Sequence, residues 1–175
     1  MKAPKCVKTN VERLLEAAGV PYVAHSFDGR EGAADAEEIA AQLGVPAASV
    51  FKTLVTRSER NAYYVFAIPA DARLDLKKAA KAAGEKALEM LPLAKLFPLT
   101  GYRHGGCSPL GMRKSFPTFI DGSARQWPRI FISAGQIGLN LEVAPEPFAK
   151  LVPAAFAPLV QDSVAGAVLG ENRGR

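Results

Sequence analysis

Apolar residues recur at helical spacing in three stretches of the first half of the chain, each opened by a capping residue and closed by a glycine. The first stretch starts with the capping-box pattern Thr9-Asn10-Val11-Glu12, and the third carries small alanines that suit close packing on a sheet. The spacing therefore predicts helices over residues 9–19, 35–44 and 75–84, a short helical turn near 92–97, and a last helix over 146–152.

Alternating or continuous apolar runs between these helices predict strands. They cover residues 22–27, 49–57, 62–68, 118–121, 129–133 and 139–144, and the polar segment 58–61 suits a hairpin turn. Because single helices alternate with hairpin-like strand pairs, the expected fold class is α+β with a mixed sheet rather than a strict βαβ repeat. We expect one domain over residues 1–160 and a small, polar tail over 161–175 that frays.

The composition is that of one globular domain, since 49% of the 175 residues are hydrophobic and can form a core. No apolar run reaches the roughly 20 residues that cross a bilayer. The first ten residues lack the apolar centre of a secretory signal, so we expect a cytoplasmic protein without membrane contact. The cysteines Cys6 and Cys107 and the histidines His25 and His104 are scattered, so neither a disulfide framework nor a metal site is expected.

Basic residues gather at two places along the chain. The net charge of +5 and the pI near 9.3 fit a polyanionic partner. The basic residues are Lys77, Lys78, Lys81 and Lys86 around the third helix, and Arg103, Arg113 and Lys114 around a glycine-rich segment. They form a track for a phosphate backbone if they face the same way; a solvated helix face is the alternative interpretation.

The glycine-rich segment over residues 101–114 is too irregular for a helix or a strand. Glycine can adopt a positive φ and lacks the Cβ that would block a ligand, and successive amides can converge on a phosphate or a developing oxyanion. A tight connection between two strands is the alternative interpretation.

Lys52 is the one charged residue in the apolar run Val50–Val55. Desolvating an ammonium group is costly unless it finds polar partners, so an inward Lys52 would be poised for a charged or polar substrate. On the solvent face of a half-buried strand it would need no such explanation.

Three motifs occur in a characteristic order and spacing: Phe51-Lys52-Thr53-Leu54, then Leu74-Asp75-Leu76-Lys77-Lys78-Ala79-Ala80-Lys81, then Gly101-Tyr102 with Gly105-Gly106-Cys107-Ser108-Pro109-Leu110-Gly111. Together they closely resemble the YbaK/EbsC family of aminoacyl-tRNA deacylases. The resemblance covers about residues 11–156 and is greatest to the Cys-tRNA(Pro) deacylases, which hydrolyse cysteine wrongly attached to proline tRNA. It implies a mixed, curled, barrel-like β-sheet surrounded by helices.

The resemblance also implies the site. Lys52 would be the essential catalytic lysine, holding the terminal adenosine or its phosphate, while Cys107 packs rather than reacts. The implied substrate-binding residues are Phe27, Thr53, Gly105, Gly106, Ser108, Pro109, Gly111, Ser133 and Gly135. The placement of basic residues predicts Lys77, Lys81, Arg113 and Lys114 as tRNA-binding residues, and no metal or cofactor is expected.

The implied activity is that of a monomeric enzyme acting on mischarged proline tRNA, with prolyl-tRNA synthetase as a candidate partner. The sequence contains no usual nucleophile triad, and the family's cysteine-specific members are thought to use the substrate's own thiol. Phe27, Ala134, Gln136 and Ile137 depart from the family pattern. Two alternatives stay open: a deacylase for alanine, serine or another residue that uses an activated water, and a catalytically weak module that binds tRNA or a synthetase.

Overall fold

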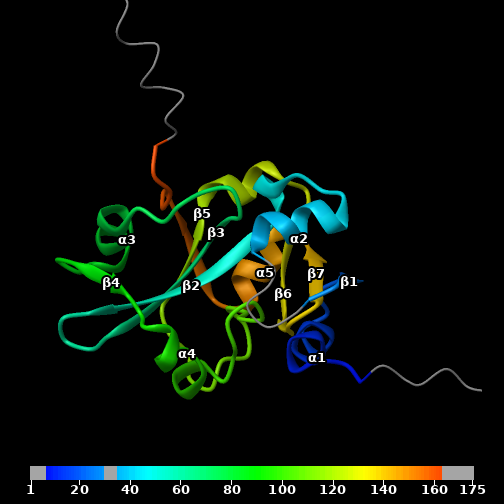
Figure 1. Ribbon diagram of the computed structural model, residues 1–175, viewed down its shortest axis with the longest axis horizontal. Coiled ribbons are helices and arrows are strands. Elements are labelled where there is room, and N and C mark those ends of the chain that lie inside the picture. Colours follow the sequence, from blue (N-terminus) through cyan, green and yellow to red (C-terminus); the bar gives the residue numbers. More distant parts are fainter. Residues whose placement is uncertain (1–6, 30–34, 163–175) are drawn as a thin grey trace, which may run out of the picture.

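The computed structural model describes residues 7–29 and 35–162. Its helices and strands alternate along the chain (Figure 1). The helices are α1 (Asn10–Ala17), α2 (Ala36–Leu43), α3 (Leu76–Ala83), α4 (Leu93–Thr100) and α5 (Pro145–Leu151), with short 3-10 turns η1 (Ala47–Ser49) and η2 (Gly122–Gln126). The strands are β1 (Tyr22–Ser26), β2 (Phe51–Ser58), β3 (Tyr63–Pro69), β4 (Leu88–Met90), β5 (Thr118–Asp121), β6 (Ile130–Gln136), β7 (Leu139–Val143) and β8 (Ala154–Ala157).

These strands form two sheets. The larger has the order β4-β2-β3-β5-β8, in which β2 and β3 are an antiparallel hairpin and β3, β5 and β8 run parallel. The smaller is antiparallel, with the order β1-β7-β6, and an isolated parallel bridge between Val50 and Phe131 links it to the start of β2. The expected α+β class with mixed pairing is confirmed; the described strands close no barrel, so the expected barrel-like curl is not confirmed.

Separate hydrophobic clusters hold the helices on the sheets. Val11 of α1 and Phe148 of α5 are fully buried against Ile132 and Leu141 on one face of the three-stranded sheet. The alanine stripe of α3 instead packs on one face of the five-stranded sheet, around Phe66. Each cluster buries apolar area that stabilises the fold by about 25 cal/mol per Å².

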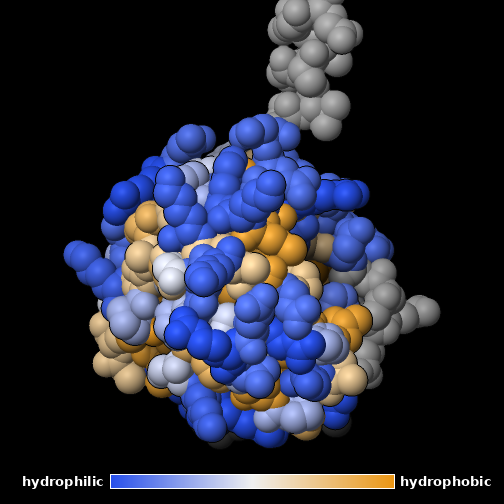
Figure 2. Space-filling view, turned by 90° about the vertical axis from the view of Figure 1, so that its left-hand side faces the viewer, coloured by the Kyte–Doolittle hydropathy of each residue, from blue (hydrophilic) through white to orange (hydrophobic). Residues whose placement is uncertain are grey.

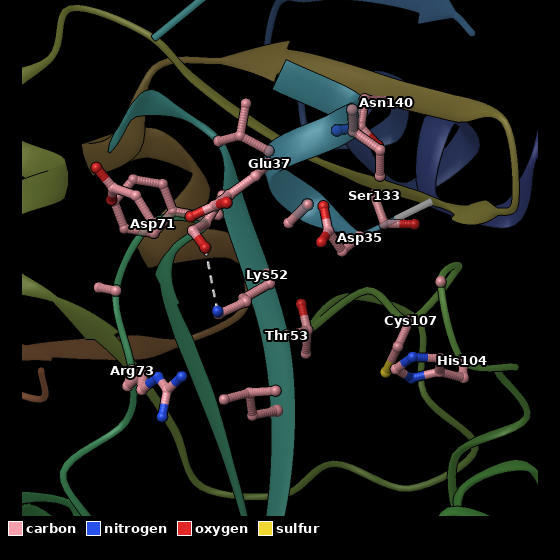
Figure 3. Close-up of a pocket in the computed structure, with 18 of the residues that line it drawn as sticks. Asp35, Glu37, Lys52, Thr53, Asp71, Arg73, His104, Cys107, Ser133 and Asn140 are labelled. Carbon is pink, nitrogen blue, oxygen red and sulfur yellow. Dashed lines mark hydrogen bonds between the residues drawn. The ribbon is translucent and has the colours of Figure 1, made fainter. Parts of the chain in front are cut away.

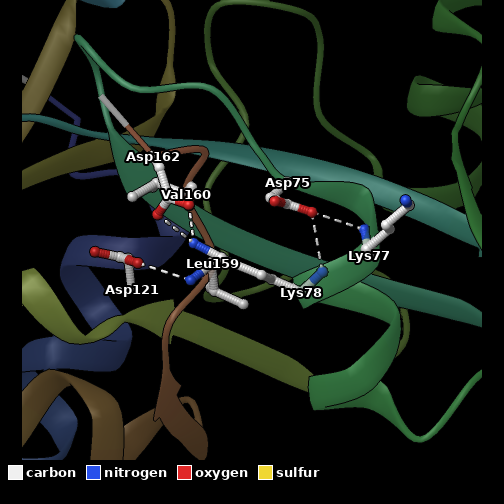
Figure 4. A network of polar contacts seen from close by, with 7 residues as sticks. All are labelled: Asp75, Lys77, Lys78, Asp121, Leu159, Val160 and Asp162. Atoms are coloured by element: carbon white, nitrogen blue, oxygen red, sulfur yellow. Dashed lines mark hydrogen bonds and ion pairs between the residues drawn. The ribbon is translucent and has the colours of Figure 1, made fainter. Parts of the chain in front are cut away.

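The capping pattern predicted the helix ends well. Asp75 accepts hydrogen bonds from the backbone amides of Lys77 and Lys78, and α3 ends at Gly84 with a left-handed φ of 72° (Figure 4). The α4 helix continues to Thr100, past the expected end near residue 97, with Pro98 inside it.

Two short strands were absent from the expectations. β4 has only three residues, and β8 is Ala-Ala-Phe-Ala, which offers no β-branched residue as a signal. β6 is also longer than expected, because it runs past Ser133 through an irregularity to Gln136.

Hydrogen bonds hold the chain after β8 against α3. The Lys78 ammonium donates to the Val160 carbonyl at 2.8 Å and pairs with Asp162 at 3.0 Å (Figure 4). The Gln161 amide donates to the Arg73 carbonyl at 2.9 Å, so the first two residues of the expected tail are bound; its remainder, 163–175, and Cys6 lie outside the described residues. No helix in the described ranges is long and apolar enough to cross a membrane.

Candidate active site

A cavity of about 390 Å³ lies where the open edge of β2 meets the smaller sheet. Among the described strands, residues 51–54 of β2 pair only with β3, because β4 pairs with Thr56, Arg57 and Ser58 and the Leu91 amide donates to the Val55 carbonyl. The smaller sheet reaches this edge of β2 through the bridge between Val50 and Phe131. The polar lining residues are drawn in Figure 3. They are Asp35, Glu37, Lys52, Thr53, Asp71, Arg73, His104, Cys107, Ser133 and Asn140, joined by Gly105 and apolar residues.

Lys52 is the half-buried cation of this cavity. In the hairpin register it lies opposite Ile68, and Leu54 lies opposite Phe66, so Lys52 shares the face that α3 covers farther along β2. Its ammonium donates one hydrogen bond, to the Ala70 carbonyl at 3.1 Å (Figure 3). Because an ammonium group has three donors, two remain for a substrate.

Burial and nearby charges set the pKa of Lys52. Burial is the largest effect and lowers this pKa below its usual value, and the positive charge of Arg73 acts in the same direction. The carboxylates of Glu37, Asp35 and Asp71 oppose the shift. The Lys52 ammonium is therefore partly desolvated, and both positive and negative side chains lie near it.

The glycine-rich loop supplies the opposite side of the cavity through His104, Gly105 and Cys107. Gly105 has a φ of 89°, as expected, and a Cβ there would have only Ile137 within 4 Å. The sequence also allowed a positive φ at Gly106, but Gly106 does not have one. A Cβ at Gly106 would lie 3.0 Å from the Ile137 amide nitrogen, so this glycine lets the loop lie against the β6–β7 turn.

Other glycines of the site make room for a tyrosine. A Cβ at Gly111 would lie 2.7 Å from the Tyr102 hydroxyl, and one at Gly135 would lie 2.8 Å from the Tyr102 ring. That hydroxyl donates to the Leu110 carbonyl at 2.6 Å and so closes the loop on itself. Six expected substrate-binding residues lie outside the cavity lining: Phe27, Gly106, Ser108, Pro109, Gly111 and Gly135.

The smaller sheet contributes Ser133 and Asn140, which are cross-strand neighbours on β6 and β7. The Ser133 hydroxyl accepts a hydrogen bond from the Gly135 amide at 3.1 Å. Phe27 follows β1, and its amide donates to the Gly138 carbonyl at 2.9 Å; its side chain does not line the cavity. Of the expected substrate-binding residues, the cavity brings together Thr53, Gly105 and Ser133 with Lys52.

Cys107 is the only described cysteine, and it is buried. Burial raises the pKa of its thiol to about 12, so the thiol is neutral near pH 7. No hydrogen bond joins it to His104 in the described part of the chain. A neutral thiol without a base is a poor nucleophile.

The helices α3 and α4 lie on the same side of the molecule (Figure 1). Lys77 and Lys81 are exposed on α3. Arg113 lies along α4, with its guanidinium 5.0 Å from the Phe97 ring centre and donating to the Pro98 carbonyl at 3.3 Å. Figure 2 shows this side as mainly hydrophilic with apolar areas between, and a continuous basic track stays a prediction.

Sequence reasoning gave no site role to six polar lining residues: Asp35, Glu37, Asp71, Arg73, His104 and Asn140. Asp35 was interpreted only as a helix cap, a role it does fill by accepting from the Glu38 amide at 2.8 Å. Asp71 and Arg73 could have been found, because the hairpin places the end of β3 beside Lys52 at the start of β2.

Comparisons with known proteins point to one family. A family model described as an aminoacyl-tRNA editing domain matches residues 30–151. EbsC of Enterococcus faecalis, provisionally named a Cys-tRNA(Pro)/Cys-tRNA(Cys) deacylase, is 44% identical over 87% of this chain and 93% of its own length.

Solved structures share the fold. One, provisionally described as a trans-editing enzyme for prolyl-tRNA synthetase, has a TM-score of 0.74 and 24% identity over 89% of this chain and all of its own. The hypothetical protein APE2540 has a TM-score of 0.78 and 23% identity over 86% of this chain and 99% of its own.

Proposed function

This chain belongs to the aminoacyl-tRNA editing domain family, and we propose that it is a free-standing deacylase that removes cysteine from proline tRNA. The enzyme class, an aminoacyl-tRNA deacylase, follows from the family and from the relatives' names. Such an enzyme meets a physical need: a synthetase pocket for a small amino acid discriminates against a similar side chain by only about 1–3 kcal/mol.

The observation that carries the proposal is the position of Lys52 across one cavity from the glycine-rich loop (Figure 3). The free donors of the ammonium suit the terminal adenosine or its phosphate. The open backbone at Gly105 would then lie near the ester carbonyl. An activated ester needs placement and charge stabilisation more than a strong protein nucleophile.

We propose that the nucleophile is the thiol of the cysteine on the substrate. Its sulfur attacks the ester carbonyl carbon and closes a four-membered thiolactone; the ester bond to the tRNA breaks, and the tRNA oxygen takes up the proton that the thiol loses. Water then opens the released thiolactone to give free cysteine. The neutral, buried Cys107 supports this route because it leaves the cavity without a protein thiolate.

Contact with the tRNA body would come from the exposed cations of α3 and of the segment after the loop. They are Lys77, Lys81, Arg113 and Lys114. Proline tRNA as the acceptor and prolyl-tRNA synthetase as a partner belong to the same proposal, supported by the printed names of EbsC and of the trans-editing structure.

A deacylation panel tests the proposal. Proline tRNA charged separately with cysteine, alanine, serine and proline is incubated with the enzyme, and the remaining ester is measured over time. Cysteine should be removed fastest and proline retained. Equal removal of alanine or serine would favour the activated-water alternative, and tRNA binding without hydrolysis would favour the binding module.

A further inference from the structure

The cavity carries charges of both signs, which a site for polyanionic tRNA alone does not explain. The cations Lys52 and Arg73 face three carboxylates, those of Asp35, Glu37 and Asp71. These carboxylates would repel a phosphate group in the cavity unless the same ligand also carried a positive group that paired with them.

These carboxylates act on Lys52 through space, but their direct contacts within the described part of the protein are few. In the described part of the chain, no carboxylate forms an ion pair with Lys52, and the Glu37 carboxylate accepts no hydrogen bond. One carboxylate oxygen of Asp35 accepts the capping hydrogen bond of α2, and the other oxygen is available to a ligand. No group of three or more potential ligands among the described residues is arranged to hold a metal ion.

Asn140 gives an independent sign of a ligand. Its residue is 4% exposed, and its side-chain amide has no hydrogen-bond partner among the residues that the structure describes. It lines the cavity from β7, beside Ser133, and Figure 3 shows both on the same side of the cavity as Asp35. Among the described residues, the side-chain polar atom that is buried without a partner is the Ser123 hydroxyl, so the Asn140 amide is open to the cavity and is available to pair with a ligand there.

We propose that the α-ammonium group of the aminoacyl ester binds between the Asn140 side chain and the carboxylates of Asp35 and Glu37. This inference rests on the proposed deacylase function. The 3′ end of the substrate carries one phosphate charge near the terminal adenosine and one positive charge on the amino acid, since an α-amino group has a pKa of about 7.7–8.0. Its three N–H donors match one amide oxygen and two carboxylates.

This arrangement would orient the ester. Lys52 holds the nucleotide end and α2 with Asn140 holds the ammonium, so the carbonyl lies between two anchored charges. It would also make the enzyme select aminoacyl-tRNA over tRNA whose amino group is acylated, as in a growing peptide.

The test compares cysteinyl-tRNA with N-acetylcysteinyl-tRNA on the same proline tRNA, by single-turnover hydrolysis with wild type and four variants. Glu37→Gln and Asp35→Asn remove charge at constant size, and asparagine keeps the helix cap. Asn140→Leu removes the amide at similar volume. Glu38→Gln is the matched control, because it removes the same charge from the same helical turn outside the cavity lining.

Wild type should hydrolyse the free-amine substrate at least about tenfold faster, the loss that one charge-assisted hydrogen bond produces. The ratio should fall in Glu37→Gln, Asp35→Asn and Asn140→Leu and persist in Glu38→Gln. Because the acetyl group's bulk is the same for every variant, only recognition of the charge changes the ratio. If Asn140→Leu does not fold, the two exposed carboxylate variants still decide the question.

Equal rates for the two substrates, or a ratio unchanged in the cavity variants, would overturn this inference and leave the deacylase function standing. Failure of wild type to hydrolyse either substrate would instead remove the proposed function, and the inference with it.

Discussion

A methyl group added at Gly106 tests whether the glycine-rich loop is positioned by its contact with the β6–β7 turn. The new Cβ would lie 3.0 Å from the Ile137 amide nitrogen and 3.2 Å from the Gln136 carbonyl carbon. Ordinary contacts between such atoms are about 3.5–4.0 Å, so loop and turn must separate by several tenths of an ångström. Both atoms belong to the backbone, so no flexible side chain can absorb the displacement.

Overpacking of this kind costs about 1–3 kcal/mol, and we expect Gly106→Ala to lower the free energy of unfolding by that amount. Gly106→Val should cost more. Deacylation should fall as well, because Gly105 and Cys107 on either side line the cavity.

Gly122→Ala is the matched control. Gly122 has no positive φ, and its Cβ would have only the Ala157 carbonyl oxygen nearby, at 4.0 Å. A compatible Gly→Ala change is neutral or stabilises by about 0.4–1 kcal/mol. Urea denaturation gives both free energies, and an ester-hydrolysis assay gives the activities. Wild-type stability and activity in Gly106→Ala would refute the tight contact.

Three further outcomes follow from the site. Cys107→Ala should remain active, because a thiol with a pKa of about 12 supplies no thiolate near pH 7; an inactive but folded variant would indicate a protein nucleophile. Binding of tRNA should weaken with salt, and each neutralising substitution at Lys77, Lys81, Arg113 or Lys114 should lower the salt slope by about 0.7–0.9 and raise KM; unchanged slopes would contradict the basic track. Proline tRNA carrying S-methylcysteine or serine should be hydrolysed much more slowly than the cysteine ester, and equal rates would exclude the substrate-thiol route.

Local signals in the sequence predicted most of the elements but not all of the cavity. Caps and terminating glycines such as Asp75 and Gly84 act within one turn, so they are visible in the sequence itself. β8 depends on pairing with β5, more than thirty residues earlier in the chain, and its own residues carry no such information.

The same contrast holds at the site. Lys52 could be singled out because a charge in an apolar strand is locally anomalous. Asn140 could not, because one polar residue in a half-buried strand is ordinary in a sequence, and only the fold shows that it is buried at the cavity. Glycines were ambiguous for a related reason: the sequence shows that a Cβ is absent, but only the fold shows that Tyr102 fills the space at Gly111 and Gly135.

The rate at which Lys52→Ala hydrolyses Cys-tRNA(Pro) tests the central claim most directly. Lys52 is half-buried and donates only to the Ala70 carbonyl, so its removal should leave the fold intact, which circular dichroism and the urea midpoint would verify. The account predicts a rate loss of about 10²–10³-fold, as for removal of one preorganised donor, and a comparable failure of Lys52→Arg, whose planar group cannot replace a compact ammonium. Near-normal hydrolysis by folded Lys52→Ala would contradict the account.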